Sequence, residues 1–493
     1  MNGKLTIYFT SDTHGFLYNT RFTDTRPSGI GLLGMRFPKD GNTLVIDGGD
    51  TIQGSPLTYF CRTEGEPLPV AAALNDREYD YVTLGNHDFN NGPEDLRAYL
   101  EELRAECLCA NVQGDLPVKP WTVRRMENGL RVGLIGLVTP WVNRWEKSEN
   151  LKGLTISNPM EAARKALREM EGQYDVLVGI YHGGIERDLE TGRLLSGTDE
   201  NIACRLCEEI PFDILLTGHQ HIALASGKWH GVHLVQTPCN AQQYIRAELG
   251  ENGQWHSELM NVPPEQTLTP RERELKGKME AWLDTPIGHL SRAILPGDRL
   301  RMAAEGSEIA DLFNRVQLWA SGAEISCTGL PNEIRGFEEN VTVRDVVSTY
   351  VYSNTLAVLR VTGKVLREAL EQCATYFDRT PEGKLTISEP FLRPKEAHFN
   401  YDFFMGIEYA FDLSRPKGQR VCRLEREGRP IAPEEEFSLV MNNYRATGSG
   451  DFECYVGCPV IREIQTEVSE LIIRYLAEHP MIQIPDPMRI CGD

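Results

Sequence analysis

The chain has 493 residues, which is enough for two or three domains of the usual size. Hydrophobic residues make up 41% of the sequence and charged residues 25%, the composition of an ordinary globular protein. The net charge of −20, from 71 acidic and 51 basic residues, argues against binding of a nucleic-acid polymer through a basic face. A small anionic substrate is still compatible with this charge, because a bound metal ion can dominate the field within a site.

The sequence predicts neither a leader peptide nor a membrane span. Its first residues, MNGKLTIYFTSDTHG, enter a strand at once and contain no hydrophobic leader with a cleavage site. No apolar run reaches the length needed to span a bilayer. The twelve cysteines are scattered, and we interpret the pair Cys204 and Cys207 as two residues of one helix rather than a metal or redox pair. We therefore expect a protein of the reducing cytoplasm that has no membrane partner.

The first half of the chain alternates between strand-like and helix-like segments. Short, mostly apolar runs predict strands at residues 4–12, 42–50, 79–87, 131–140, 175–184 and 212–221. Helical periodicity predicts helices between them, at residues 67–77, 93–106 and 159–173. This alternation is typical of an α/β domain whose strands are covered on both faces.

A change of composition separates this half from the second. Residues 263–286, PPEQTLTPRERELKGKMEAWLDTP, are polar, begin with prolines and turn into a charged helix, so we expect an interdomain linker helix there. The second half then combines strands, a Gly turn and an amphipathic helix in residues 353–377, a two-strand pattern in 405–431 and a strand leading into a Gly-rich loop in 436–452. The expected domains are therefore 1–262 and an α+β domain at 287–493.

Polar residues of the kinds that bind metals follow five of the predicted strands of the first half. They lie where each strand ends, which is the edge at which open α/β sheets bind ligands. These residues are Asp12, His14, Asp50, Asn86, His87, His182, His219 and His221. Each fragment alone also has a structural explanation, such as an Asx turn, a helix N-cap or a hydrogen-bonded histidine. A metal site accounts for all five strand ends together, and we prefer it for that reason.

The residue types also indicate the kind of metal centre. Carboxylate, imidazole and amide ligands suit Zn²⁺, Mn²⁺ or Fe. Without His87, seven candidate ligands remain, which are too many for one tetrahedral ion, whereas two divalent ions sharing a bridging carboxylate would use them all. Two such ions about 3.5–4 Å apart can clamp a phosphoryl group and activate water. His87 directly follows one of the ligands, Asn86, so it is placed to stabilise or protonate a leaving oxygen.

These motifs resemble those of the calcineurin-like metallophosphoesterases. The resemblance rests on D-x-H, G-G-D, G-N-H-D, H-G-G and G-H-x-H in this order. The segments GGDTIQGSP and MNNYRATGSGD narrow it to the 5′-nucleotidase family, which includes UDP-sugar hydrolases and 2′,3′-cyclic phosphodiesterase/3′-nucleotidases. The resemblance implies an N-terminal metallophosphoesterase β-sandwich flanked by helices, followed by a C-terminal α+β domain of the 5′-nucleotidase type.

The resemblance also implies roles for individual residues. One ion would be held by Asp12, His14, Asp50 and His221. The other ion would be held by Asp50, Asn86, His182 and His219. Many family members have Gln where this chain has His221, which is still a competent ligand. In the C-terminal domain, Tyr352 and Tyr444 match the two aromatic positions between which the family binds the nucleotide base, although packing is the simpler interpretation of either tyrosine alone.

Two departures from the 5′-nucleotidase pattern bear on the substrate. An Asp usually follows the catalytic His by three residues and orients it, whereas this chain has Asn90 three residues after His87. The segment GNHDFNNG instead resembles the cyclic-phosphodiesterase branch, and from the sequence alone we expect Asn90→Asp to be tolerated. The family's Gly-Gly-Gly-x-Arg stretch is also missing, with ISCTGLPNEIRG in its place.

The sequence therefore predicts a dinuclear metallophosphohydrolase that acts on small nucleotides, most closely the 2′,3′-cyclic phosphodiesterase/3′-nucleotidase type. The nearest enzymatic alternative is a 5′-nucleotidase or UDP-sugar hydrolase. A nucleotide-binding protein with a decayed site is the non-enzymatic alternative, and the complete ligand set argues against it.

Overall fold

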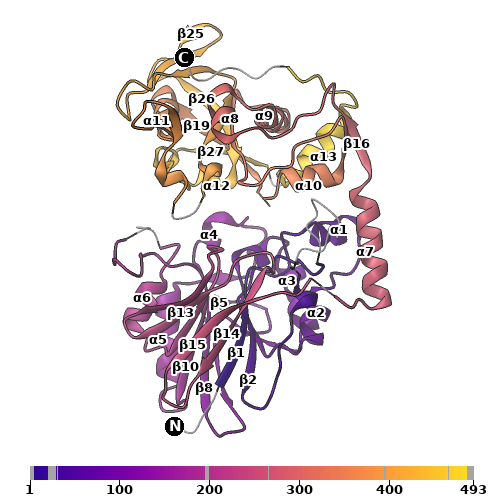
Figure 1. The fold of residues 1–493 in the computed structure, drawn as a ribbon, viewed down its shortest axis with the longest axis vertical. Helices are drawn as coiled ribbons and strands as arrows, with labels where there is room; N and C mark the ends of the chain where they lie inside the picture. Colours follow the sequence, from indigo (N-terminus) through magenta and orange to yellow (C-terminus); the bar gives the residue numbers. More distant parts are fainter. Residues whose placement is uncertain are drawn as a thin grey trace. The chain divides into compact units, whose positions relative to one another are not determined.

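A computed structural model of the chain describes residues 5–19, 29, 31–194, 199–264, 266–352, 354–393, 396–464 and 466–485 (Figure 1). The chain divides into two compact units, Met1–Met279 and Glu280–Asp493, and the helix α7 (Pro270–Leu283) contains the boundary between them. Residue 265 of the expected linker lies outside the described residues. Among the helices that the structure describes, none is long and apolar enough to cross a membrane.

The first unit contains two large sheets. The larger sheet has the strand order β15-β14-β1-β2-β3-β4-β6. Its strands are β1 (Leu5–Thr10), β2 (Thr43–Asp47), β3 (Tyr81–Val82), β4 (Glu106–Leu108), β6 (Val118–Lys119), β14 (Gln243–Leu249) and β15 (Trp255–Asn261). The chain runs parallel from β1 through β2 and β3 to β4 and β6. The carboxyl ends of β1, β2 and β3 therefore lie at one edge of this sheet.

The second large sheet has the order β12-β13-β11-β10-β8-β7. Its strands are β7 (Trp121–Arg125), β8 (Arg131–Val138), β10 (Val176–His182), β11 (Ile214–Thr217), β12 (Leu224–Trp229) and β13 (Val232–Gln236). Strands β8, β10, β11 and β13 are parallel neighbours, so this sheet also brings several strand ends to one edge. A small pair, β5 (Val112–Gln113) with β9 (Thr155–Ile156), lies outside both sheets.

Strand β10 shows why these sheets form a sandwich covered by helices. All seven of its residues are buried. Val178 and Ile180 pack into the core that the two sheets share, together with Ile7 of β1. Leu177 lies on the other face, in a cluster with Leu206 of α6. A strand that is buried on both faces has a continuous run of apolar residues in its sequence. The expected sandwich of two sheets flanked by helices is confirmed.

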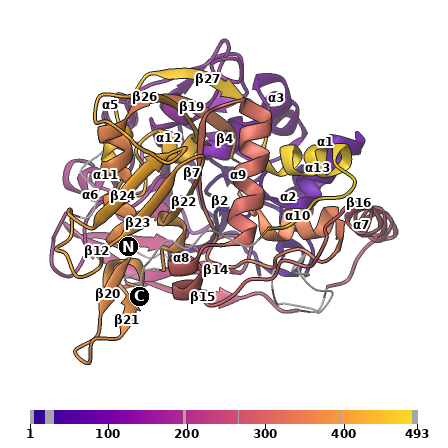
Figure 2. The same cartoon turned by 90° about the horizontal axis from the view of Figure 1, so that it is seen from above.

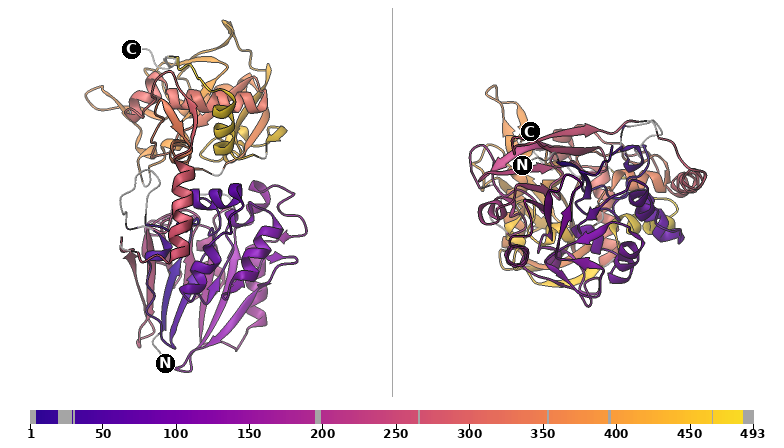
Figure 3. Two further views of the ribbon diagram at one scale, coloured as in Figure 1. Left: turned by 90° about the vertical axis from the view of Figure 1, so that its right-hand side faces the viewer. Right: turned by 90° about the horizontal axis from the view of Figure 1, so that it is seen from below.

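The helices of the first unit lie on both sides of the sheets. They are α1 (Pro56–Glu64), α2 (Val70–Asp76), α3 (Pro93–Glu102), α4 (Val142–Trp145), α5 (Pro159–Glu169) and α6 (Ala203–Glu209), with short 3-10 turns η1 (Leu32–Gly34) and η2 (Asn86–Phe89). Figure 1 shows α5 and α6 on one side and α2 and α3 on the other, and Figure 3 shows the helices of the first hundred residues on one face. Cys204 and Cys207 both lie in α6 and are buried, as the helical periodicity predicts.

The second unit is built on a five-stranded sheet with the order β22-β17-β26-β19-β27. Its strands are β17 (Ile325–Gly329), β19 (Leu356–Thr362), β22 (Asp402–Met405), β26 (Glu436–Asn442) and β27 (Val460–Ile464). Smaller pairings join β16 (Pro286–His289) to β18 (Asn340–Thr342), β20 (Phe377–Arg379) to β21 (Leu385–Ile387), and β23 (Glu408–Phe411), β24 (Val421–Arg426) and β25 (Arg429–Pro430) to one another.

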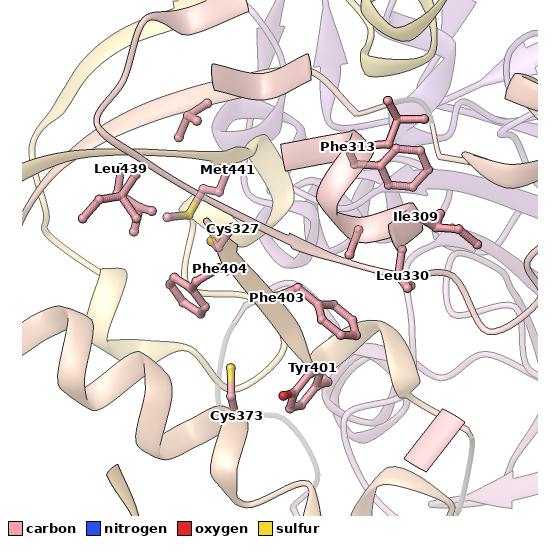
Figure 4. Packing of buried hydrophobic residues seen from close by; sticks show 14 of the residues in the cluster. Ile309, Phe313, Cys327, Leu330, Cys373, Tyr401, Phe403, Phe404, Leu439 and Met441 are labelled. Carbon is pink, nitrogen blue, oxygen red and sulfur yellow. The ribbon is translucent and has the colours of Figure 1, made fainter. Parts of the chain in front are cut away.

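Helices pack against this sheet and form the core of the second unit. They are α8 (Arg299–Glu305), α9 (Glu308–Ser321), α10 (Val343–Thr349), α11 (Gly363–Ala374), α12 (Asn443–Ala446) and α13 (Val468–Glu478), with 3-10 turns at Glu389–Phe391, His398–Asn400 and Glu453–Tyr455. Figure 2 shows α9 lying along the sheet. Ile309 and Phe313 of α9 pack in one buried cluster with Cys327 of β17, Phe404 of β22 and Met441 of β26 (Figure 4). The expected α+β domain is confirmed.

Candidate metal centre

The predicted metal-binding residues of the first unit follow the carboxyl ends of strands in both sheets. Asp12 and His14 follow β1, Asp50 follows β2, and Asn86 opens the turn η2 after β3. His182 is the last residue of β10 in the other sheet. His219 and His221 follow β11, which is the neighbour of β10. The two sheets thus bring together residues that are up to 209 positions apart in the chain (12 to 221).

Five of these side chains form two overlapping groups of converging ligand atoms, and Asp12 belongs to both. The first group consists of Asp12, His14 and His221. The His221 Nε2 atom lies 3.3 Å from Asp12 Oδ1 and 3.3 Å from His14 Nε2. The second group consists of Asp12, Asp50 and His182. The His182 Nε2 atom lies 3.2 Å from Asp50 Oδ2 and 3.9 Å from Asp12 Oδ1.

Backbone carbonyls orient two of the histidines toward this centre. The Nδ1 atom of His14 lies 2.9 Å from the carbonyl oxygen of Gln53, and that of His182 lies 2.7 Å from the carbonyl oxygen of Gly48. A carbonyl oxygen only accepts, so each Nδ1 carries the proton and each Nε2 is the atom available to a metal. The His182 Nε2 atom is buried and makes no hydrogen bond. An unsatisfied buried nitrogen facing two carboxylates fits a divalent cation.

His219 and Asn86 extend the second group. The Nδ1 atom of His219 lies 2.9 Å from Asn86 Oδ1, and its Nε2 lies 3.1 Å from Glu200 Oε1. The rings of His219 and His182 are in edge contact, with centroids 5.7 Å apart. Trp145 stacks on His219 at 5.4 Å between ring centroids. Because the Glu200 carboxylate accepts from Nε2, Nε2 carries the proton, and Nδ1, which lies beside the Asn86 oxygen, is the atom available to a metal.

The charges of the centre suit a cation. Burial alone would raise the pKa of Asp12, but the facing His182 and His221 lower it to about 2. The pKa of Asp50 is also held well below its usual range, because His182 and His87 outweigh the effect of burial. Burial lowers the pKa of His14 to about 4, so its ring is neutral at pH 7. The ionised carboxylates and the neutral His14 ring are protonation states that metal binding requires. The pKa values of His182 and His221 are raised to about 10, His182 by the facing carboxylates, so a metal ion would have to displace a proton from each of these two rings.

The backbone is strained at the same positions. A positive φ is uncommon for residues other than glycine, and it costs on the order of 1–3 kcal/mol when a residue is held there. The candidate ligands with positive φ are Asp12 (55°), His14 (50°), Asp50 (55°), His219 (73°) and His221 (59°). Strain that persists at five ligand positions indicates that the loops are shaped to present these side chains.

His87 lies beside the centre without joining either group. Its backbone N–H donates to Asp50 Oδ1 at 2.7 Å. Its ring is in edge contact with that of His14, with centroids 5.5 Å apart. Its Nδ1 lies 2.8 Å from the side-chain oxygen of Asn90. Asn90, three residues after His87, therefore contacts the histidine ring through its side-chain amide.

The two aromatic positions of the second unit also lie near each other. Tyr352 is partly buried, and its ring meets that of Tyr350 edge-on at 6.2 Å between centroids. The phenol groups of Tyr352 and Tyr444 are close enough to interact electrostatically. Tyr444 belongs to α12, and the guanidinium of the next residue, Arg445, is buried in an ion pair with Asp402 at 2.8 Å.

Comparison with known proteins shows which family the chain resembles. Residues 5–223 match the family described as calcineurin-like phosphoesterase, and residues 286–457 match the 5′-nucleotidase C-terminal domain. A solved structure of a protein assigned as a 5′-nucleotidase from Staphylococcus aureus, in complex with alpha-ketoglutarate, is 31% identical, covers 99% of this chain and all of that one, and has a TM-score of 0.88. The chain belongs to the 5′-nucleotidase family.

Other relatives of this chain are named after different activities on nucleotides. The trifunctional nucleotide phosphoesterase protein YfkN of Bacillus subtilis is 23% identical over 97% of this chain, which spans only 38% of that relative's length. The 2′,3′-cyclic-nucleotide 2′-phosphodiesterase/3′-nucleotidase of Salmonella typhimurium is 25% identical over 83% of this chain and 74% of its own.

Asp88 is a further residue of this family member's centre, and the strand-end pattern did not single it out. It is buried and accepts four backbone hydrogen bonds. Its Oδ2 accepts from the N–H groups of Asp50 (2.9 Å) and Gly85 (2.8 Å). Its Oδ1 accepts from those of Thr51 (2.9 Å) and Ile52 (3.2 Å). One carboxylate thus ties the loop after β2 to the loop after β3, the loops that carry Asp50 and Asn86.

Glycines let the same two loops meet closely. Gly49 has a φ of 90°, and a Cβ atom there would lie 2.2 Å from the backbone nitrogen of Gly85. A Cβ atom on Gly85 would lie 2.2 Å from Asp50 Oδ1. Any side chain at either position would separate the loops, which explains the glycines of GGD and GNHD physically.

We predict that Asp88→Asn loosens the metal centre. The amide has only one acceptor oxygen, so its nitrogen faces two backbone N–H donors and leaves both unsatisfied. We expect a loss of unfolding free energy on the order of 2–4 kcal/mol and weaker Mn²⁺ binding. Denaturant unfolding and Mn²⁺ titration measure the two effects. The control is Asp95→Asn, an exposed residue in the first turn of α3. Equal stability and Mn²⁺ affinity in Asp88→Asn and the control would refute the assigned role.

Proposed function

We propose that the chain is a dinuclear metal-dependent phosphohydrolase acting on nucleotides, with the chemistry in the first unit. The observation that carries the proposal is the buried set of converging ligand atoms, in which His182 Nε2 faces Asp12 and Asp50 and makes no hydrogen bond. Membership of a family of phosphoester hydrolases supports the same conclusion. The non-enzymatic alternative, a binder with a decayed site, is disfavoured because every expected ligand type is present and buried or partly buried.

The proposed ligand sets follow the family's motifs. One divalent ion (Mn, Zn or Fe) would be held by Asp12, His14, Asp50 and His221. The second would be held by Asp50, Asn86, His182 and His219. Asp50 is the proposed bridge because it matches the family's shared ligand, whereas Asp12 is the carboxylate common to the two groups of converging atoms. The Asp50 Oδ1 atom also accepts from the His87 backbone N–H. Two such ions, when bound, orient a phosphoryl group and lower the pKa of a water molecule between them.

His87 is the proposed proton donor to the leaving oxygen. Its position is fixed at two points, because the backbone N–H is held by Asp50 and the ring Nδ1 is held by Asn90. The opposite ring atom, Nε2, is then the one left to exchange a proton with substrate. A histidine in this position contributes to catalysis by general acid action, typically 10²–10⁴-fold.

The cyclic-phosphodiesterase/3′-nucleotidase type is the preferred substrate assignment. Asn90 in place of an acidic residue and the similarity to relatives of that name, from Salmonella typhimurium and Haemophilus influenzae, support it. The alternative is a 5′-nucleotidase or UDP-sugar hydrolase, and its 5′-nucleotidase form is supported by the Staphylococcus aureus protein assigned as a 5′-nucleotidase, at 31% identity.

A substrate panel tests the proposed function directly. With Mn²⁺ present, we expect the highest kcat/KM for 2′,3′-cyclic AMP and 3′-AMP, and lower values for 5′-AMP and UDP-glucose. Preference for 5′-AMP or UDP-glucose would select the alternative. Absence of hydrolysis with all four substrates, in protein shown to be folded, would favour the non-enzymatic binder.

The second unit is the proposed holder of the nucleotide base. Tyr352 and Tyr444 match the family's stacking positions and lie near each other, and the buried Arg445–Asp402 pair supports the helix that carries Tyr444. The Arg445 side chain also packs on the Phe452 ring, 4.1 Å from its centroid, and donates to the carbonyl oxygens of Ser449 and Phe399.

We predict that Tyr352→Ala and Tyr444→Ala each weaken nucleotide hydrolysis selectively. Stacking of a base on an aromatic ring is worth about 1–3 kcal/mol, so each change should raise KM for a nucleotide about tenfold or more. A phenyl phosphodiester without a purine or pyrimidine should be hydrolysed as before. The comparison of kcat/KM for these two substrates is the measurement.

The matched control is Tyr475→Ala, a tyrosine of α13 that packs against Trp319 and His479 in the same unit. It should alter both activities equally or not at all. If the nucleotide and the phenyl ester lose activity in parallel in Tyr352→Ala and Tyr444→Ala, the two tyrosines are packing residues.

A further inference from the structure

A chain of hydrogen bonds leads from His87 to a carboxylate outside the recognised motifs. The His87 Nδ1 atom lies 2.8 Å from Asn90 Oδ1. At the other end of the same amide, Asn90 Nδ2 donates to Glu146 Oε2 at 2.5 Å. Glu146 follows α4 directly, in the loop after β8, and is 56 residues away from Asn90 in the sequence.

The carboxylate determines which way the amide points. An asparagine side chain can rotate by half a turn and exchange its oxygen and nitrogen, and either end can meet a histidine nitrogen. An ionised carboxylate has only acceptor atoms, so the amide nitrogen of Asn90 has to face Glu146. Its oxygen then faces His87 and accepts from Nδ1–H. In the neutral ring, Nδ1 therefore carries the proton and Nε2 is bare. Nε2 has to take up a proton before His87 can act as the donor, and the resulting imidazolium keeps its Nδ1–H on Asn90 while Nε2–H faces the substrate.

Glu146 is itself held in place on its far side. Its Oε1 accepts from the side-chain nitrogen of Asn150 at 2.8 Å and from the backbone N–H of Lys147 at 2.7 Å. The Asn150 nitrogen also lies 2.7 Å from the backbone oxygen of Asn90, which closes the network. The residue before Glu146, Trp145, stacks on His219. One short segment therefore contacts the centre at two places.

We propose that Glu146 is a positioning residue that, through Asn90, fixes the tautomer and orientation of His87. The inference rests on the proposed function of His87 as proton donor. In the 5′-nucleotidase branch an acidic residue bonded directly to the catalytic histidine orients it. Here Glu146 would orient His87 indirectly, because the neutral amide of Asn90 lies between the Glu146 carboxylate and the His87 ring.

The proposal changes what is expected of Asn90→Asp. The sequence alone predicts that this substitution is tolerated. With Glu146 at hydrogen-bond distance, an aspartate there would bring two like-charged carboxylates together, which is unfavourable unless one of them takes up a proton. Glu146→Gln should remove this conflict, because a glutamine side chain can donate to the new aspartate.

The test is a double-mutant cycle. Glu146→Gln should lower kcat about tenfold with KM for the nucleotide and Mn²⁺ content unchanged, because Asn90 can then adopt both orientations. Asn90→Asp should lower kcat as well. The double variant Asn90→Asp/Glu146→Gln should recover most of the wild-type kcat. Glu149→Gln, an exposed acid of the same segment, is the control and should have no effect.

A readout that is independent of turnover separates this inference from the proposed function. Histidine ¹⁵N–¹H correlation spectra report which ring nitrogen carries the proton, and His87→Ala assigns the signal. Wild-type protein should show His87 protonated at Nδ1, and Glu146→Gln should show a mixture of tautomers. A double variant no more active than Asn90→Asp, or a Glu146→Gln spectrum identical to wild type, would overturn the role of Glu146. Failure of wild-type protein to hydrolyse any nucleotide would instead overturn the proposed function.

Discussion

Two carboxylates and a histidine meet with almost no exposure to solvent at the point where β1, β2 and β10 end. Asp12, Asp50 and His182 are each no more than 1% exposed. Burying ionised groups costs several kcal/mol per ion unless opposite charge compensates for them. Among the side chains, His182 supplies part of that charge, because Asp50 and Asp12 outweigh burial and raise its pKa to about 10. Divalent cations would supply it more completely, and the rest of the first unit holds these groups in place against their mutual repulsion.

Several features hold the short loops that carry the candidate ligands close together. Glycines 49 and 85 allow the backbones to approach, and the four hydrogen bonds to Asp88 join the loops that carry Asp50 and Asn86. Five candidate ligands adopt left-handed backbone conformations that are uncommon for residues other than glycine. The apolar core between the sheets provides the rigid base, since β1 and β10 contribute buried residues to it from opposite sheets. Strain at the loops is therefore balanced by packing beneath them.

Much of this centre could be predicted from the sequence because strand ends are a local signal. β1, β2, β10 and β11 are short apolar runs, and parallel neighbours bring their carboxyl ends to one edge wherever the loops go. β3, only two residues long, is marked mainly by the GNHD that follows it. Glu146 and Glu200 do not lie directly at a strand end, and they contact Asn90 and His219 from loops whose course depends on tertiary packing. Glu146 does follow a strand, β8, so the same rule extended to acidic residues beyond the first turn would have included it.

The account depends most directly on the number of metal ions that the chain binds. Protein stripped with a chelator and titrated with Mn²⁺, with bound metal measured by elemental analysis, gives that number. The account predicts two ions per chain at saturation, with phosphoester hydrolysis absent in the stripped protein and restored as both sites fill. Saturation at one ion, or full hydrolysis in protein free of metal, would contradict it.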